Sequence, residues 1–166
     1  MEIRRARTAD VRAIRALVDT YTADRRLLSK ATVTLYESVQ EFWVAVVDER
    51  VVGCGALHVM WEDLAEIRTV AVDPACRGMK IGHRIVTALL DEARDLGVAR
   101  VFCLTFETRF FSSFGFAEID GAPVPPTVYE QLLRSYDEGV AEFLDLERVK
   151  PNTLGNTRML LHLQGG

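Results

Sequence analysis

The stretch that decides the fold runs from Glu66 to Val86 and reads EIRTVAVDPACRGMKIGHRIV. Its apolar segment Thr69–Val72 is typical of a buried strand and stops at Asp73-Pro74. A short loop carrying Arg77-Gly78 follows, and a helix is expected to begin near Lys80. Amides at a helix start have no intrahelical acceptor, and the helix dipole adds partial positive charge there. Strand, glycine-containing loop and helix start therefore predict a site for an anion such as a phosphate group.

The segments around this stretch predict one α/β domain over residues 1–166. Apolar runs predict strands near residues 3–6, 42–47, 51–60, 62–72 and 100–105, after Gly115-Phe116, and at 158–163. Apolar residues at helical spacing predict helices near residues 11–21, 32–40 and 80–96, around Phe110, and at 127–137. Short connections make most pairs antiparallel, and the helix at 80–96 makes one right-handed parallel crossover. The insertion, residues 123–156, is longer than the usual connection of about four to six residues, so we expect it to be functional.

Composition narrows the class of protein. The 166 residues are 49% hydrophobic with a net charge of −4, which favours a globular domain and argues against nucleic acid as a partner. Three cysteines without a C-x-x-C pair predict neither a disulfide framework nor a zinc site, and three scattered histidines predict no metal. The first residues have no apolar signal core, and no run could span a bilayer, so we expect a cytoplasmic protein without a membrane partner. Five arginines near the start are interpreted as a solvated helix face, with an interface or an acidic ligand as the alternative: Arg4, Arg5, Arg7, Arg12 and Arg15.

The order of elements and the pattern A-V-D-P-x-x-R-G-x-x-I-G resemble the GNAT acetyltransferases, which use acetyl-CoA. The resemblance implies a mixed, mostly antiparallel sheet whose splayed parallel strands bind acetyl-CoA, with helices on both faces. The family's loop reads Arg/Gln-x-x-Gly-x-Gly/Ala; Arg77, Ile81 and Gly82 fit, but Lys80 replaces the inner glycine. A P-loop or a dinucleotide-binding loop is excluded, because neither glycine pattern is present at the required place. Carried over, the backbone of Val70, Ala71 and Val72 lines pantetheine, and the pyrophosphate is held by Arg77, Gly78, Met79, Lys80, Ile81, Gly82 and His83.

Acetyl transfer to an amine needs a base, a donor to the thioester oxygen and a path for the leaving thiolate. By resemblance, Glu66 is the base and the Val70 amide is the donor; the alternative is that Glu66 forms an ion pair on a solvated face. By strand alternation, Glu66, Arg68, Val70 and Val72 are expected to share one face. Many relatives place a tyrosine acid where this chain has Phe111. Thr105 is then the nearest hydroxyl, although it also suits the end of a strand, and release of free thiolate or a water is a further alternative.

Several short motifs together resemble N-acetylglutamate synthases, in particular the short bacterial form without an amino-acid kinase domain. They are Leu28-Ser29-Lys30, Gly53-Cys54-Gly55-Ala56-Leu57, Glu66-Ile67, Leu104-Thr105, Phe110-Phe111 with Gly115-Phe116, residues 136–140, residues 149–155 and Asn156-Thr157-Arg158. The resemblance implies acetylation of the α-amine of L-glutamate, which opens arginine biosynthesis, by a homodimer. It places Lys30, Asn156 and Thr157 at the glutamate site, whereas Arg68 is a candidate by strand position alone. The alternatives are a GNAT enzyme for glutamine, another amino acid or a small amine, and a catalytically weak sensor of acetyl-CoA or arginine.

Overall fold

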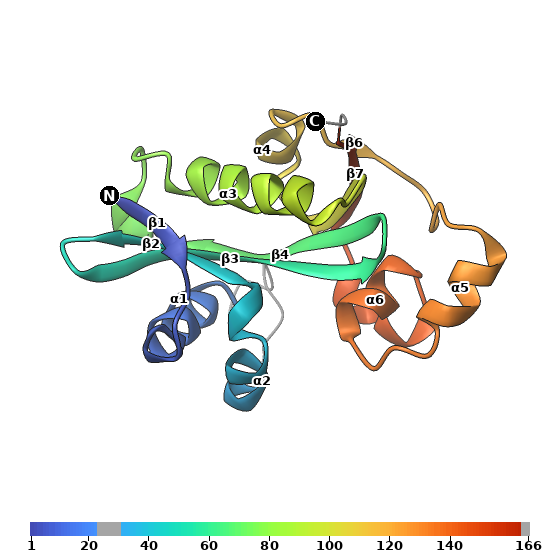
Figure 1. Ribbon diagram of the computed structural model, residues 1–166, viewed down its shortest axis with the longest axis horizontal. Helices are drawn as coiled ribbons and strands as arrows, with labels where there is room; N and C mark the ends of the chain where they lie inside the picture. Colours follow the sequence, from blue (N-terminus) through green and yellow to red (C-terminus); the bar gives the residue numbers. More distant parts are fainter. Residues whose placement is uncertain (23–30, 164–166) are drawn as a thin grey trace. The chain divides into compact units, whose positions relative to one another are not determined.

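The computed structural model describes residues 1–22 and 31–163 (Figure 1). In these residues seven strands form one sheet in the order β1-β2-β3-β4-β5-β7-β6. The chain divides into two compact units: unit 1 is Met1–His58 with Ile67–Asp95, and unit 2 is Val59–Glu66 with Leu96–Gly166. Strands β3 (Arg50–Trp61) and β4 (Leu64–Val72) pass through both units. The sheet is mixed: β4 and β5 pair in parallel, whereas β1–β2, β2–β3, β5–β7 and β6–β7 pair antiparallel. This arrangement confirms the predicted fold class.

Unit 1 contains the antiparallel strands β1 and β2 and the part of β3 that pairs with β2. The β2–β3 connection places Asp48 and Glu49 at φ 49° and 64°, the left-handed values that a two-residue hairpin turn requires. The bounds of the strands are Glu2–Arg5 for β1 and Phe42–Val47 for β2. The other elements of unit 1 are α1 (Val11–Thr22), α2 (Thr32–Glu37), α3 (Ile81–Leu96) and the 3-10 turns Thr8–Asp10, Val39–Glu41 and Pro74–Cys76.

The two faces of β3 in unit 1 are packed in different ways. One face joins an apolar cluster with α1 and α2, in which Ile14, Leu35 and Cys54 are fully buried. The other face presents Gly53 and Gly55 to α3. A Cβ added at Gly53 would lie 2.6 Å from the Ile81 Cγ2, and one at Gly55 would lie 2.7 Å from the Ile85 Cγ2. The two glycines therefore allow α3 to approach the strand closely, which fixes where the first turn of α3 lies.

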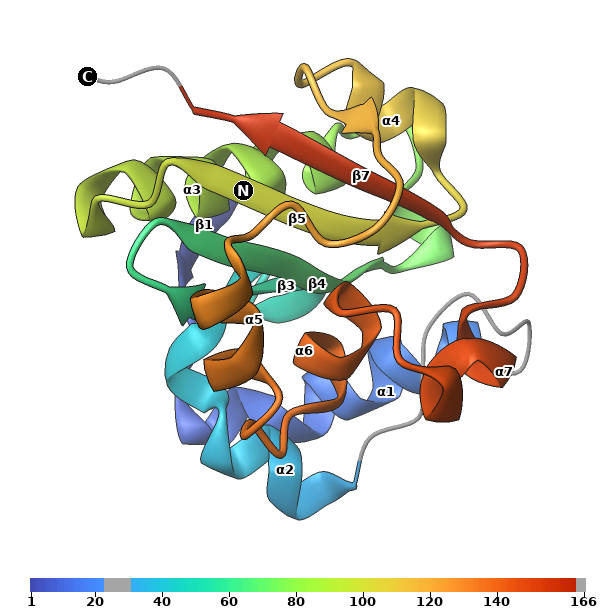
Figure 2. The same ribbon diagram turned by 90° about the vertical axis from the view of Figure 1, so that its right-hand side faces the viewer.

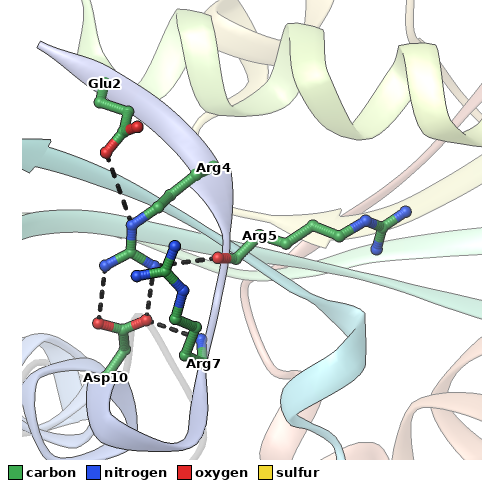
Figure 3. A network of polar contacts seen from close by, with 5 residues as sticks. All are labelled: Glu2, Arg4, Arg5, Arg7 and Asp10. Atoms are coloured by element: carbon green, nitrogen blue, oxygen red, sulfur yellow. Dashed lines mark hydrogen bonds and ion pairs between the residues drawn. The ribbon is translucent and has the colours of Figure 1, made fainter.

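The arginines near the start do not form one helix face, so that interpretation is wrong. Arg4 and Arg5 lie on β1, and Arg7 precedes the 3-10 turn before α1. Figure 3 shows the Arg4 guanidinium facing the Asp10 carboxylate, with N–O distances of 2.7 and 3.1 Å. Asp10 also accepts the Arg7 amide at 2.7 Å, and Arg5 bonds Glu92 of α3 at 2.7 Å. Hydrogen bonding by Arg4 lowers the pKa of Asp10.

Unit 2 is built on strand pairs of both directions. Strand β4 pairs with β5 in parallel through Leu64↔Arg100, Ala65↔Val101 and Glu66↔Phe102. Strand β7 pairs antiparallel with β5 and with β6. Figure 2 shows α5 and α6 side by side, and residues of both contribute to a core around Phe102 and Phe143. The elements are β5 (Arg100–Thr105), α4 (Thr108–Ser112), β6 (Ala117–Glu118), α5 (Pro126–Leu132), α6 (Glu138–Phe143), the 3-10 turn Glu147–Val149, α7 (Lys150–Thr153) and β7 (Thr157–His162).

The insertion differs most from the sequence expectation. The helix predicted at 127–137 ends at Leu132, and α6 and α7 were not predicted. With six and four residues, these helices are too short to show a clear helical period. The start of α6 is set by a local contact, because the Asp137 side chain accepts the Val140 amide at 3.0 Å. The helix expected at 32–40 also stops early, at Glu37.

Candidate active site: an anion-binding loop and a buried carboxylate

Asp73, the first residue of the loop between β4 and α3, makes two hydrogen bonds that fix the start of the loop. The Asp73 side chain accepts the Ala75 amide at 3.0 Å, and the Asp73 amide donates to the Val52 carbonyl at 2.8 Å. Helix α3 then begins at Ile81, whose side chain is 2% exposed. The amides of its first turn lack helical acceptors and carry the positive end of the dipole. The side chains that precede this turn, Arg77 to Lys80, are exposed, so the loop presents backbone and positive charge.

Lys80, where the family pattern has glycine, adopts φ +58°, and Gly78 adopts φ +85°. The left-handed region favours glycine and costs other residues about 1–2 kcal/mol. The backbone at position 80 thus has the conformation that explains the family's glycine, and this chain adopts it with a lysine. Between Arg77 and Arg84 the sequence has no carboxylate. The loop therefore suits a polyanion, and Lys80 adds a cation to it.

The end of β4 has an irregular backbone. Thr69 adopts φ +59° although it is β-branched and only 7% exposed, a combination that marks strain. Val70 lies beside Gly55 on the α3 face, whereas its neighbour Ala71 joins the α1 cluster, so these two side chains lie on opposite faces. That Glu66 and Arg68 share the face of Val70 and Val72 stays a prediction. The carbonyl of Val72 accepts the Tyr21 hydroxyl, which fixes the strand end.

Glu66 is a buried carboxylate, with 3% of its surface exposed. The alternative of an ion pair on a solvated face is therefore wrong. Its Cα partner on β5 is Phe102, the last parallel pair between these strands, so the two side chains share a face of unit 2. Burial raises the pKa of the neighbouring Cys103 thiol, and the Glu66 charge raises it further. Cys103 is thus a protonated, unreactive thiol.

Arg158 of β7 lies on the same face, and the sequence alone leaves open whether it is an ordinary exposed charge or a functional group. Its guanidinium donates to the carbonyls of Glu142 at 2.6 Å, Phe143 at 2.5 Å and Gly121 at 2.8 Å. Burial lowers the pKa of Arg158, and nearby carboxylates, Glu66 among them, oppose that shift. An exposed charge is excluded. No sequence pattern predicts this role, because the acceptors are backbone carbonyls.

The other residues proposed from sequence lie as follows in unit 2. Thr105, 9% exposed, accepts the Glu107 amide at 2.8 Å, and its Cα partner on β7 is Thr157. Asn156 precedes β7 and does not lie on it, and its backbone N–H donates to the Thr153 carbonyl at 3.1 Å. Phe111 is 6% exposed and packs edge to face on Phe116, 5.3 Å between ring centroids. It has no phenol to donate a proton.

In unit 1, Arg68 lies on β4 and is partly buried. Lys30 lies outside the described residues. Within residues 1–22 and 31–163, no group of three or more His, Cys, Asp or Glu side chains is arranged to hold a metal ion. No helix in that same part of the chain is long and apolar enough to cross a membrane.

Comparison with known proteins identifies the family of the chain. The model of the acetyltransferase (GNAT) family matches residues 11–116. An amino-acid acetyltransferase of Mycobacterium tuberculosis is 65% identical over 164 residues, which cover 97% of this chain and 94% of the relative. The crystal structure of Rv2747 from Mycobacterium tuberculosis, in complex with CoA and NLQ, superposes with a TM-score of 0.95 at 63% identity, over 99% of this chain and 100% of that one.

A more distant structure has the same fold. It is the N-acetylglutamate synthase of Neisseria gonorrhoeae complexed with coenzyme A and N-acetyl-glutamate, with a TM-score of 0.78 at 23% identity. The match covers 98% of this chain but 35% of that protein.

Proposed function

The chain belongs to the acetyltransferase (GNAT) family, and from this premise we propose that it transfers the acetyl group of acetyl-CoA to the α-amine of L-glutamate. It is an acetyl-CoA-dependent N-acetyltransferase. The observation that carries the proposal is the 65% identity to an amino-acid acetyltransferase along nearly the whole of both chains. The product would be N-acetylglutamate, which places the enzyme at the first step of arginine biosynthesis.

Binding of the donor is assigned to unit 1. The amides at the start of α3, together with the exposed Arg77 and Lys80, suit the pyrophosphate of acetyl-CoA. Met79, Gly78 and residues 81–83 contribute through the backbone, and the β4 backbone at 70–72 lines pantetheine. Because Tyr21 already donates to the Val72 carbonyl, we assign the pantetheine contacts mainly to Val70 and Ala71.

Acetyl-CoA supplies an activated thioester, and residues of the chain move the protons and stabilise the charge. We assign Glu66 as the base that takes a proton from the substrate ammonium, directly or through water. The Val70 amide, which follows the left-handed Thr69, donates to the thioester oxygen as negative charge develops there. Thr105 already accepts the Glu107 amide through its Oγ1, so its hydroxyl proton is left to donate a hydrogen bond to the leaving thiolate.

The two carboxylates of glutamate need cations and polar groups. We assign Thr157 and Asn156 in unit 2 to this role, with Arg68 and Lys30 as the cations. Thr157 is paired with Thr105 across β5 and β7, which supports placing both residues at one end of these strands.

Thiol release from acetyl-CoA, measured with a panel of amino acids and small amines, tests the proposal. We expect the highest kcat/KM with L-glutamate and essentially none with amines that lack an α-carboxylate. A preference for glutamine or for another amine would overturn the choice of acceptor while leaving the reaction in place. If acetyl-CoA binds but no amine of the panel is acetylated, the proposed enzymatic role is overturned and a sensor of acetyl-CoA is favoured.

We also propose that the two compact units act as one catalytic domain, with residues 123–156 as its insertion, and that the enzyme is a cytoplasmic homodimer. Two buried free thiols, Cys54 and Cys103, suit a reducing compartment. Light scattering during size-exclusion chromatography tests the oligomeric state, and a mass equal to the 18.6 kDa monomer would contradict the dimer.

A further inference from the structure

Arg158 connects the insertion to the strand face that carries Glu66. We infer that Arg158 is a positioning residue for acetyl transfer, which orders the end of α6 and supplies the positive charge that the buried Glu66 carboxylate needs. The inference rests on the proposed role of Glu66 as the base.

The end of α6 is held by hydrogen bonds from outside the helix. The last carbonyls of a helix lack intrahelical donors and need other partners. Here the Asp145 amide donates to the Glu142 carbonyl at 3.1 Å and the Leu146 amide to the Ala141 carbonyl at 3.2 Å, with Asp145 at φ +59°. Arg158 adds its bonds to the carbonyls of Glu142 and Phe143. One guanidinium therefore completes the end of α6 and, through the Gly121 carbonyl, also holds the chain that leads into the insertion.

The guanidinium of Arg158 lies over an aromatic ring of the sheet. Its Cζ lies 5.1 Å from the ring centroid of Phe102. Phe102 is the Cα partner of Glu66 on β4, and its ring packs edge to face against Phe143 of α6, with centroids 5.1 Å apart. The cation thus lies over the residue paired with Glu66, and it also bonds the end of α6.

Arg158 is surrounded by negative charges from several elements. The carboxylates whose charges act on it are Glu66 on β4, Glu142 on α6, Asp145 after α6 and Asp120 after β6. The Cys103 thiol on β5 stays neutral because burial and Glu66 both raise its pKa. Glu66 and Glu142 are 3% and 7% exposed. A buried carboxylate loses much of the hydration that stabilises its charge, so a nearby cation favours its ionised form.

Stability alone does not account for an arginine at position 158. Its Nε is buried and has no hydrogen-bond partner among the described residues. Hydrogen bonds therefore compensate the desolvation of this half-buried side chain only in part, and replacing buried ionic groups by well-packed apolar residues is often neutral or stabilising. A methionine would also cover Phe102. Loss of function in such a variant would come from the missing charge and from the missing bonds to α6.

Three variants separate these effects. Arg158→Met removes the charge and the carbonyl bonds, whereas Arg158→Lys keeps the charge and loses the planar fork of donors. Arg100→Met is the matched control. Arg100 on β5 also ties the insertion to the sheet, through the Pro123 carbonyl at 2.5 Å, and it also pairs with Asp63. For each variant we would measure the pH profile of kcat/KM for L-glutamate, the Kd of acetyl-CoA and the Tm.

We expect Arg158→Met to lower kcat at least tenfold and to move the acidic limb of the profile upward by about one pH unit, with the Kd of acetyl-CoA unchanged. Arg158→Lys should keep the limb near its wild-type position. Arg100→Met should leave the limb in place. If Arg158→Met does not fold, Arg158→Gln serves as the uncharged variant with the same expectation.

The results separate failure of this inference from failure of the proposed function. If the wild type does not turn over glutamate, the proposed function is wrong. If Glu66→Gln keeps full activity, the assignment of Glu66 as the base is wrong. Neither conclusion depends on Arg158. If the wild type turns over glutamate and Glu66→Gln does not, an unshifted limb in Arg158→Met overturns the role of Arg158. A limb shifted equally in Arg158→Met, Arg158→Lys and Arg100→Met overturns it as well, because the cause would then be a loosened insertion.

Discussion

The loop at residues 77–83 and the cluster formed by Glu66, Glu142 and Arg158 use their side chains in opposite ways. The loop in unit 1 offers backbone amides, and most of its side chains are exposed. The cluster in unit 2 contains two buried carboxylates, with Glu66 3% and Glu142 7% exposed, and the half-buried Arg158. The loop should therefore tolerate changes of side chain and depend on where the backbone lies. The cluster should depend on the identity of each charged group.

The largest effect is expected at Glu66. Glu66→Gln keeps the shape and removes the basic oxygen, so we expect kcat to fall about 100-fold or more. The Kd of acetyl-CoA should not change, because the donor is bound by the loop. Thiol-release kinetics and calorimetric titration of acetyl-CoA check both statements. Full activity in this variant would show that the cluster is structural.

A large effect is also expected where a side chain would move the loop backbone. In Gly55→Ala, the new Cβ would lie 2.7 Å from the Ile85 Cγ2 and 3.1 Å from the Leu89 Cδ1. We expect a loss of about 1–3 kcal/mol in the free energy of unfolding, and weaker binding of acetyl-CoA as α3 shifts. Chemical denaturation and calorimetry measure the two quantities.

A second change at Ile85 tests whether the contact with the new Cβ causes these losses. Ile85→Ala removes the Cγ2 methyl group, whereas Ile85→Val would keep a methyl group in its place. If the double variant Gly55→Ala with Ile85→Ala is no closer to wild type in acetyl-CoA affinity than Gly55→Ala alone, then close packing of α3 does not set the position of the loop.

A smaller effect is expected at Asp10, which tests a buried charge that has no catalytic role. Because the Arg4 hydrogen bond lowers the pKa of Asp10, its stabilising effect is fully present above the ordinary value of 3.8. The effect is lost as the pH falls below that value through the lowered one. Asp10→Asn should cost about 1–3 kcal/mol near neutral pH and less in acid, as measured by unfolding at several pH values. A cost independent of pH across this range would contradict the ion pair.

The smallest effect is expected at Lys80. Lys80→Gly removes the strain of φ +58°, so the free energy of unfolding should rise by up to about 1 kcal/mol. The affinity for acetyl-CoA should fall only a few-fold, since one exposed cation is lost while every amide remains. A loss of affinity greater than 100-fold would show that this loop binds through its side chain.

The same contrast explains what could be predicted from the sequence. The loop was predictable because its strand, glycine and helix start are consecutive residues with known backbone preferences. The positions of Glu66 and Thr105 on strands followed from apolar runs. The left-handed Thr69 was not predictable, because threonine has no preference for that conformation and the surrounding packing imposes it. The role of Arg158 was missed because it bonds carbonyls at residues 121, 142 and 143, and any residue supplies a carbonyl.

The central claim is that this chain acetylates the α-amine of L-glutamate. Its most direct test is to incubate the purified protein with acetyl-CoA and L-glutamate, with glutamine in a parallel reaction, and to identify the products by mass spectrometry while free CoA is quantified. We predict N-acetylglutamate formed in equal amount to CoA, with a higher kcat/KM than for glutamine. CoA release that does not depend on glutamate, or acetylation of glutamine in preference to glutamate, would contradict the account.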